Sequence, residues 1–294
     1  MQRAPTDPEG ATVGRVIVRK PISTISTVST ISTVSTTSRR QRQDRLAAEE
    51  PLELRLAGVR LAMTMRTPGQ DVELAHGYLL GEGIIADRED VRTARYCAGT
   101  DEQGRNTYNV LDIALAPDMP SPLTAVGDPQ DAASCTLSGA SVAAGVAHRA
   151  RFAPSTDPFT VNAEVLAELT TTFDEHRRGF AATGGLHAAA LFDATGRILA
   201  TREDVGRHNA ADKVLGWALM HDRVPVAGNG MLVSGRLSFD LVRKATMAGV
   251  AMVATASAPS SLAVDLAAER GMTLVGYLRE GSMNVYTRAE RVTG

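Results

Sequence analysis

The sequence predicts an α/β protein in which an α+β N-terminal part precedes a C-terminal mixed, partly parallel sheet flanked by helices. Three patterns support this fold class. Strand-like and helix-like segments alternate after about residue 229, alternating apolar and polar residues indicate β-hairpins before that point, and segments with helical periodicity separate them. Two consecutive strand-helix-strand units imply parallel strands, because each helix returns across one face of the sheet.

Length and composition narrow the class of protein. The 294 residues, 44% hydrophobic and 22% charged, suffice for two domains of ordinary size. A formal charge of −2 disfavours nucleic-acid binding, and we expect no membrane segment because no run of about 18 apolar residues occurs. Cys97 and Cys135 are the two cysteines, and neither has a partner at metal-ligand spacing. This pattern favours a cytoplasmic protein without a bound metal ion or disulfide framework.

The first 45 residues are predicted to be a flexible, low-complexity region. Residues 22–36 read ISTISTVSTISTVST, and a basic run follows at 39–42. A three-residue period gives neither a strand face nor a helix face, although β-branched side chains suit a strand locally. We therefore expect a mobile insertion followed by a solvated linker.

A first domain is predicted over residues 46–140. Alternation around Gly58 indicates a β-hairpin, and residues 71–84 have helical periodicity with Asp71 as a possible cap. His76 on this helix is expected to be packed or exposed rather than catalytic. A long polar loop at 117–135 then ends at Cys135, after which a further helix is expected.

The second domain is predicted over residues 141–294. Two strands around residues 194–196 are followed by a helix with Asn209 as its expected cap. The expected order thereafter is strand, helix, strand, helix, strand, in the segments GMLVSG, SFDLVRKATMAG, VAMVATAS, SSLAVDLAAERG and TLVGYL.

Ligands of such sheets collect beyond the carboxyl ends of the parallel strands, where helix N-termini offer free N–H groups to anions. Residues 234–236 and 257–261 occupy such positions, and either could contact a phosphate or serve as an ordinary connector. A separate polar cluster precedes them in the sequence and could bind phosphate or perform acid–base chemistry. Its members are Asp204, Arg207, His208 and Lys213, with Gly184, Gly185 and His187 nearby.

Cys135 is the candidate nucleophile. It lies in a polar loop just before an expected helix, and a helix N-terminus lowers a thiol pKa. Asp128 and Asp131 act in the opposite direction, so an inert side chain is the alternative interpretation. Cys97 is expected in a strand.

From about Ala47 onward the chain resembles the FdhD family. The matching segments, in order, are AAEEPLELRLAG, RTPGQDVELAHGYLLGEGII, TGGLHAAALF, REDVGRHNAADKVLG, LVSGRLSFDLVRKA, SAPSSLAVDLA and LVGYLREGSMNVYT. The resemblance implies a sulfurtransferase that takes persulfide sulfur from a cysteine desulfurase. It would deliver the sulfur to the molybdenum cofactor, Mo-bis-molybdopterin guanine dinucleotide, for the formate dehydrogenase apoenzyme. It also implies a cytidine-deaminase-like C-terminal domain and a homodimer, but the chain lacks the His-x-Glu and Pro-Cys-x-x-Cys residues of zinc deaminases.

The resemblance assigns roles to particular residues. Cys135 falls on the first cysteine of the family's Ser-Cys-Gly-x-Cys-Gly loop, whereas Ser138 replaces the second. A hydroxyl cannot resolve a persulfide, so a two-cysteine relay is excluded and a one-cysteine transfer is expected. A chaperone that binds the cofactor without carrying sulfur is the alternative. The expected cofactor contacts are Tyr277, Leu278, Arg279, Glu280, Gly281 and Ser282, with His187 and Arg207.

Overall fold

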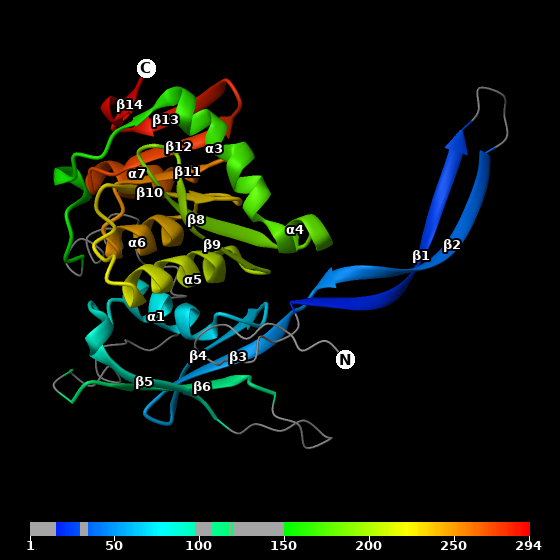
Figure 1. Ribbon diagram of the computed structural model, residues 1–294, viewed down its shortest axis with the longest axis horizontal. Helices are drawn as coiled ribbons and strands as arrows, with labels where there is room; N and C mark the ends of the chain where they lie inside the picture. The colour runs from blue at the N-terminus through cyan, green and yellow to red at the C-terminus, as the bar shows by residue number, and fades with distance from the viewer. Residues whose placement is uncertain (1–15, 30–34, 98–106, 118, 120–149) are drawn as a thin grey trace.

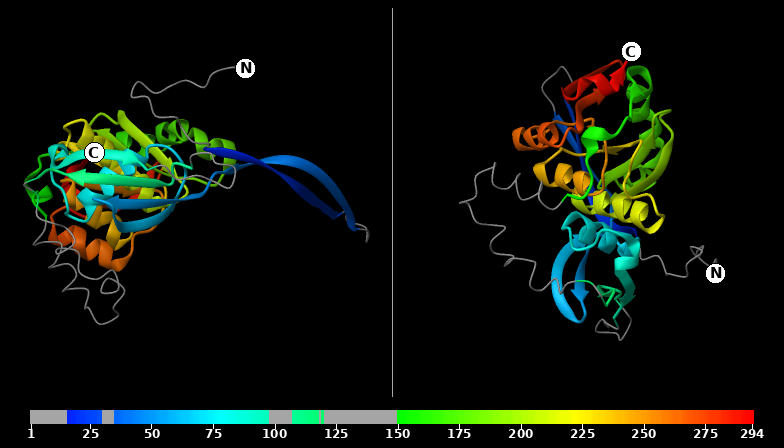
Figure 2. Two further views of the ribbon diagram at one scale, coloured as in Figure 1. Left: turned by 90° about the horizontal axis from the view of Figure 1, so that it is seen from below. Right: turned by 90° about the vertical axis from the view of Figure 1, so that its left-hand side faces the viewer.

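The computed structural model describes residues 16–29, 35–97, 107–117, 119 and 150–294. Sheets and helices are stacked in a body, from which a long two-stranded arm extends to one side (Figures 1 and 2). The predicted mixed α/β class is confirmed. The implied likeness to cytidine deaminases and the division at residue 140 stay predictions. No helix in the described ranges is long and apolar enough to cross a membrane.

The arm consists of β1 (Ile17–Ser29) and β2 (Ser35–Ala47), which pair antiparallel with Ile17 opposite Ala47. We expect a mobile insertion at 22–36 from the sequence, but the described residues of this segment lie in strands. Its Ile, Val and Thr residues favour extended backbone, and the pairing of β1 with β2 satisfies main-chain hydrogen-bonding groups. At the base of the arm the Ala48 N–H donates to the Val16 carbonyl at 2.9 Å.

The N-terminal part of the body is a four-stranded sheet with one helix on it. The strand order is β4-β3-β6-β5, with β3 and β6 parallel. Leu52, Leu54 and Leu56 of β3 alternate toward the core, which confirms the predicted hairpin. The elements are β3 (Glu50–Leu56), β4 (Val59–Arg66), α1 (Asp71–Gly81), the 3-10 turn η1 (Arg88–Asp90), β5 (Val91–Tyr96) and β6 (Val110–Leu115).

The C-terminal part contains a six-stranded sheet in the order β13-β12-β11-β10-β8-β9. Strands β10, β11 and β12 are parallel, as the two predicted strand-helix-strand units require, and the flanking pairs are antiparallel. The strands are β8 (His187–Asp193), β9 (Ile198–Asp204), β10 (Asn229–Val233), β11 (Met252–Thr255), β12 (Thr273–Arg279) and β13 (Ser282–Thr287). Two short strands, β7 (Val161–Asn162) and β14 (Val292–Thr293), pair separately, beside the 3-10 turns η4 (Pro154–Thr156) and η5 (Ala289–Arg291).

Helices cover both faces of this sheet (Figure 1). One face packs on α3 (Ala163–His176) through Leu166, Leu169 and Phe173. The other face packs on α5 (Arg207–Met220), α6 (Phe239–Met247) and α7 (Ser261–Glu269). The short helix α4 (Arg178–Thr183) precedes β8. Buried side chains of the N-terminal sheet, α1 and these three helices form one continuous cluster, so the two parts share a core.

Helices α1 and α5 cross at very close range. A Cβ added to Gly77 would lie 1.9 Å from the Asp212 carbonyl oxygen, and one added to Gly216 would lie 1.8 Å from the Glu73 carbonyl oxygen. Two glycines at one crossing bring the main chains together, because neither has a side chain to separate them. The N-terminal part is thereby held against the C-terminal part.

Two predicted helix caps are wrong. Asp71 is the first residue of α1 and forms a buried ion pair with Arg66, whose Nη2 lies 2.9 Å from Oδ2, so its carboxylate does not cap the helix. Asn209 lies within the first turn of α5, after the cap residue Gly206. Its amide instead donates to the Met65 carbonyl at 2.7 Å. In both cases a buried tertiary partner competes with the local capping bond.

Candidate functional site

The predicted polar segments meet at one edge of the C-terminal sheet. Val233 at the end of β10 lies opposite Thr255 at the end of β11, and β12 runs in the same direction. Because β8 is antiparallel to β10, its first residue, His187, reaches this edge as well, opposite Asp204 at the end of β9. The edge is where ligands bind in open α/β sheets.

His187 and Arg207 flank the turn after β10. A Cβ on Gly235 would lie 3.2 Å from His187 Nδ1 and 3.4 Å from Arg207 Cδ, so the glycine lets both side chains lie close to this turn without crowding. Ser234 Oγ accepts from the Ala188 N–H at 2.9 Å and lies 3.4 Å from His187 Nδ1. These contacts bring together two residues that the sequence analysis assigned to the cofactor.

The electrostatics of this group favour an anion. Burial lowers the pKa of His187, and the nearby guanidinium groups of Arg207 and Arg177 lower it further, against a smaller opposing effect of Asp204. The imidazole is therefore neutral at neutral pH and can donate or accept one hydrogen bond. Arg207 Nε is buried and has no hydrogen-bond partner among the described residues. An oxyanion is the natural partner of such a group.

Asp204 and Lys213 form a buried ion pair and are not exposed at the site. Lys213 Nζ lies 2.7 Å from Asp204 Oδ2, and both side chains are fully buried. The Thr67 N–H donates to Oδ2 at 3.1 Å, while Gly206 N–H donates to Oδ1 at 2.9 Å. With its oxygens occupied in this way, Asp204 is unsuited to the acid–base role considered for it, and it fixes the start of α5 that carries Arg207.

A second polar group, which sequence reasoning missed in part, lies at the start of α6. His208 Nε2 is 3.2 Å from Ser238 Oγ and 3.8 Å from Asp240 Oδ2. Both partners face the same ring nitrogen, so this is not a relay through the imidazole. Burial lowers the pKa of His208, with Asp240 opposing it. Only the Ser-Phe-Asp sequence at a helix start could have indicated this contact.

The turn between β12 and β13 carries the predicted contacts 277–282. Tyr277 (φ 50°) and Gly281 (φ 76°) have left-handed backbone, and the pairing of the two strands shifts between Gly276 and Arg279. The Leu278 side chain is fully buried in the core, so only its main chain can face a ligand. Tyr277, Arg279, Glu280, Gly281 and Ser282 are exposed.

Main-chain contacts join this turn to the rest of the edge. The Tyr277 N–H donates to the Ser257 carbonyl at 2.9 Å, and the Ser257 N–H donates to Thr255 Oγ1 at 3.0 Å. Thr255 Oγ1 in turn donates to the Gly235 carbonyl at 2.8 Å. The connectors at 234–236 and 257–261 thus link the predicted cofactor residues into one framework.

Other candidates are distributed elsewhere. Cys135, Ser138 and the helix expected after them lie outside the described residues. Cys97 directly follows β5 and is partly buried with a free thiol, and its N–H donates to the Val110 carbonyl at 2.9 Å. His76 is packed, as expected, with Nδ1 2.7 Å from the Val72 carbonyl.

The fold and its edge define the class: an α/β protein with a polar, anion-favouring site at the carboxyl ends of parallel strands. The sequence profile of the FdhD/NarQ family matches residues 47–293, and the chain belongs to this family. The arm up to Leu46 lies outside that match.

Individual relatives agree with this assignment. A sulfur carrier protein FdhD of Mycolicibacterium paratuberculosis is 52% identical over 250 residues, covering 85% of this chain and 92% of the relative. One from Nocardia farcinica is 54% identical over 250 residues, covering 85% and 88%. A crystal structure described as a formate dehydrogenase accessory protein of Desulfotalea psychrophila matches with a TM-score of 0.67 and 25% identity, over 92% of this chain and 99% of that one.

Proposed function

We propose that this protein is a sulfur carrier in the maturation of a formate dehydrogenase, with Cys135 as the sulfur-bearing residue. The observation that carries the proposal is membership of the FdhD/NarQ family over 47–293, with relatives named as sulfur carrier proteins at about half identity. Only Cys135 falls on a cysteine of the family's reactive loop. A cytoplasmic location is part of the proposal, since a persulfide carrier requires a reduced thiol.

Sulfur loading is a thiol exchange at Cys135. Its thiolate attacks the terminal sulfur of a cysteine desulfurase persulfide, a new S–S bond forms, and the desulfurase cysteine leaves as a thiolate. No net oxidation occurs. Ser138 cannot displace the bound sulfur, so the persulfide on Cys135 persists until an acceptor takes it.

The acceptor in this proposal is the molybdenum cofactor, as Mo-bis-molybdopterin guanine dinucleotide, bound as substrate at the sheet edge. Arg207, whose buried Nε has no partner among the described residues, and neutral His187 offer donors to phosphate oxygens. The exposed turn at 277–282 offers Glu280 as an acceptor for a guanine edge and Arg279 as a cation. The formate dehydrogenase apoenzyme would then receive the sulfurated cofactor, with the carrier acting as a homodimer.

Sulfur uptake tests the proposal directly. After incubation with cysteine and a cysteine desulfurase, mass spectrometry should find one added sulfur on the Cys135 peptide, removable by dithiothreitol. Cys135→Ser should abolish the gain, and Cys97→Ser is the matched control that should keep it. Ser138→Cys should allow a disulfide that competes with the persulfide under oxidising conditions.

The alternative function is a cofactor-binding chaperone, which the Ser138 replacement favours. If the wild-type chain binds the cofactor and gains no sulfur, the carrier proposal fails and the chaperone function stands.

A further inference from the structure

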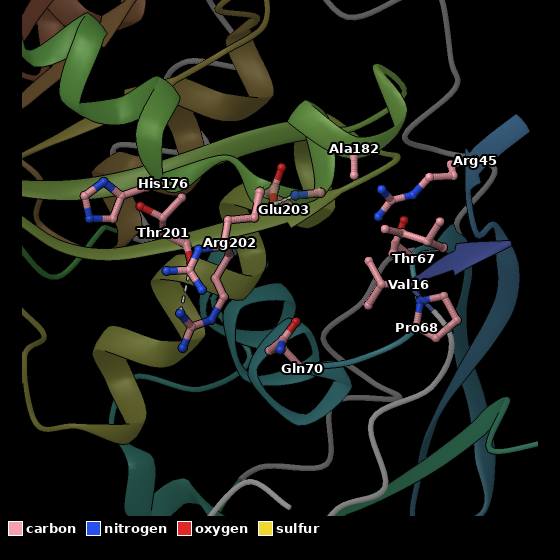
Figure 3. A pocket seen from close by; sticks show the side chains of 13 residues that line it. Val16, Arg45, Thr67, Pro68, Gln70, His176, Ala182, Thr201, Arg202 and Glu203 are labelled. Atoms are coloured by element: carbon pink, nitrogen blue, oxygen red, sulfur yellow. Dashed lines mark hydrogen bonds between the residues drawn. The ribbon is translucent and has the colours of Figure 1, made fainter. Parts of the chain in front are cut away.

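A cavity lies at the base of the arm, at the β9 end of the C-terminal sheet and at the opposite end of the strand order from residues 277–282. Its volume is about 470 Å³, within the range of small-molecule sites. Strand β9, helix α4, the entry to α1 and the base of the arm line it, and it is open to solvent on one side (Figure 3). The lining residues are Val16, Ile17, Arg45, Thr67, Pro68, Gln70, His176, Arg178, Gly179, Ala182, Thr201, Arg202 and Glu203.

Two charged residues of β9 that line the cavity, Arg202 and Glu203, already have hydrogen-bond partners. Glu203 is the only carboxylate among the described lining residues, and its two oxygens accept the Gly179 and Phe180 N–H groups, each at 2.7 Å. Arg202 is held by Glu73 outside the cavity, with Nη2 2.7 Å from Oε1. Neither side chain is therefore free to satisfy the other charges of the cavity.

Two further arginines remain. Arg45 on β2 and Arg178 on α4 are exposed, and neither forms an ion pair within the described part of the chain. Figure 3 shows the Arg45 side chain reaching from the arm toward Ala182. Guanidinium groups bind carboxylate and phosphate in bidentate geometry.

An apolar wall completes the cavity. Val16 and Ile17 at the start of the arm and Pro68 before α1 contribute it, together with Ala182. A ligand that fits both parts has an anionic head and a small apolar body. We propose that this cavity binds a small organic anion, whose phosphate or carboxylate group lies between Arg45 and Arg178 and whose apolar part contacts Val16, Ile17 and Pro68.

The cavity differs from the turn at 277–282 in place and in origin. Residues 277–282 join β12 to β13 at one end of the strand order, whereas the cavity is lined by β9 at the other end. Val16, Ile17 and Arg45 precede residue 47, where the family match begins. The arm thus contributes an arginine and part of the apolar wall that the family-matched residues alone do not supply.

Direct titration of the full chain tests the proposal without reference to sulfur transfer. Calorimetry would use phenyl phosphate and phenylacetate as the two head groups, with inorganic phosphate to measure the contribution of the apolar wall. We expect at least one of the two aromatic probes to bind. If phenyl phosphate binds, it should bind more tightly than inorganic phosphate. Arg45→Ala and Arg178→Ala should each weaken that probe about fivefold or more, since each removes a charge-assisted contact.

Matched controls separate this site from others. Arg39→Ala removes an exposed arginine on the same face of β2, six residues from Arg45, and should leave binding unchanged. Arg279→Ala should also have no effect, because residue 279 belongs to the sheet edge. Ala182→Phe should block the cavity, which provides a test that removes no charge.

The outcomes are decisive in both directions. Absence of binding by both aromatic probes overturns the proposal, as does unchanged affinity in both arginine variants. If Arg279→Ala loses binding and Arg45→Ala keeps it, the probe is bound near residue 279, and the proposal is overturned as well. Thermal unfolding of each variant, expected within a degree of the wild type, shows that the fold is retained.

Discussion

Replacing either glycine at the crossing of α1 and α5 by alanine should lower the stability of the protein, although helix propensity alone would raise it. Alanine in place of glycine within a helix ordinarily stabilises a protein by about 1 kcal/mol. In this protein Gly77→Ala would place a methyl carbon 1.9 Å from the Asp212 carbonyl oxygen, and Gly216→Ala would place one 1.8 Å from that of Glu73. We therefore expect both substitutions to destabilise the fold.

The magnitude follows from the atoms involved. Ordinary contacts of a Cβ lie at 3.4–4 Å, so the helices must separate by more than 1 Å, and the opposing atoms are main-chain atoms that cannot rotate away. Overpacking of this kind costs about 1–3 kcal/mol, and the rigid neighbours place this case at the upper end. After the gain in helix propensity, each variant should lose roughly 2 kcal/mol.

Urea unfolding would measure this loss through the fluorescence of Trp217, the single tryptophan, which lies on α5 itself. Gly185→Ala is the matched control, because its added Cβ would lie 3.5 Å from Ala47 Cβ, an ordinary contact. An unchanged or raised free energy of unfolding in Gly77→Ala and Gly216→Ala would refute the close crossing.

Three further predictions concern other parts of the molecule. Arg279→Ala should weaken guanine nucleotide binding by about 1.5–3 kcal/mol and reduce its salt dependence, whereas unchanged affinity in calorimetry would remove Arg279 from the site. Burial lowers the pKa of His76, so the unfolded chain binds more protons and stability is lost as the pH falls through about 6.5. His76→Gln should reduce the loss between pH 7 and 5, and equal loss in urea unfolding of both proteins would contradict this. Deleting residues 22–37 should leave the thermal midpoint unchanged, since the far part of the arm extends away from the body (Figure 1), and a fall of several degrees would show that it packs there.

Regular local patterns allowed most of the secondary structure to be predicted. The order of elements from β8 to β12 follows from hydrophobic periodicity bounded by glycine, serine and proline, and the parallel strands follow from the connections. The helix caps could not be predicted in the same way. Asp71 and Asn209 have side chains suited to capping, but Asp71 binds Arg66, five residues earlier, and Asn209 binds the Met65 carbonyl, which tertiary structure brings near.

The candidate site was predictable to a similar extent. Strand direction places His187, Arg207 and residues 277–282 at one edge, because the carboxyl ends of parallel strands lie together. The role of Asp204 was not predictable, since its burial with Lys213 depends on Thr67 from a distant segment. The cavity beneath the arm was also missed, because its lining combines residues from 16 to 203 with no shared sequence pattern.

The shared core has a consequence for synthesis on the ribosome. The face of α1 that receives α5 is translated first, yet its partner does not begin until Arg207, about 125 residues after α1 ends at Gly81. At about 5–20 residues per second, the interval lasts on the order of 10 s. During that time the face of α1 around Gly77 lacks the helix that later covers it. The nascent N-terminal part is thus a candidate client for a chaperone that recognises an uncovered helix face until the second half of the chain emerges.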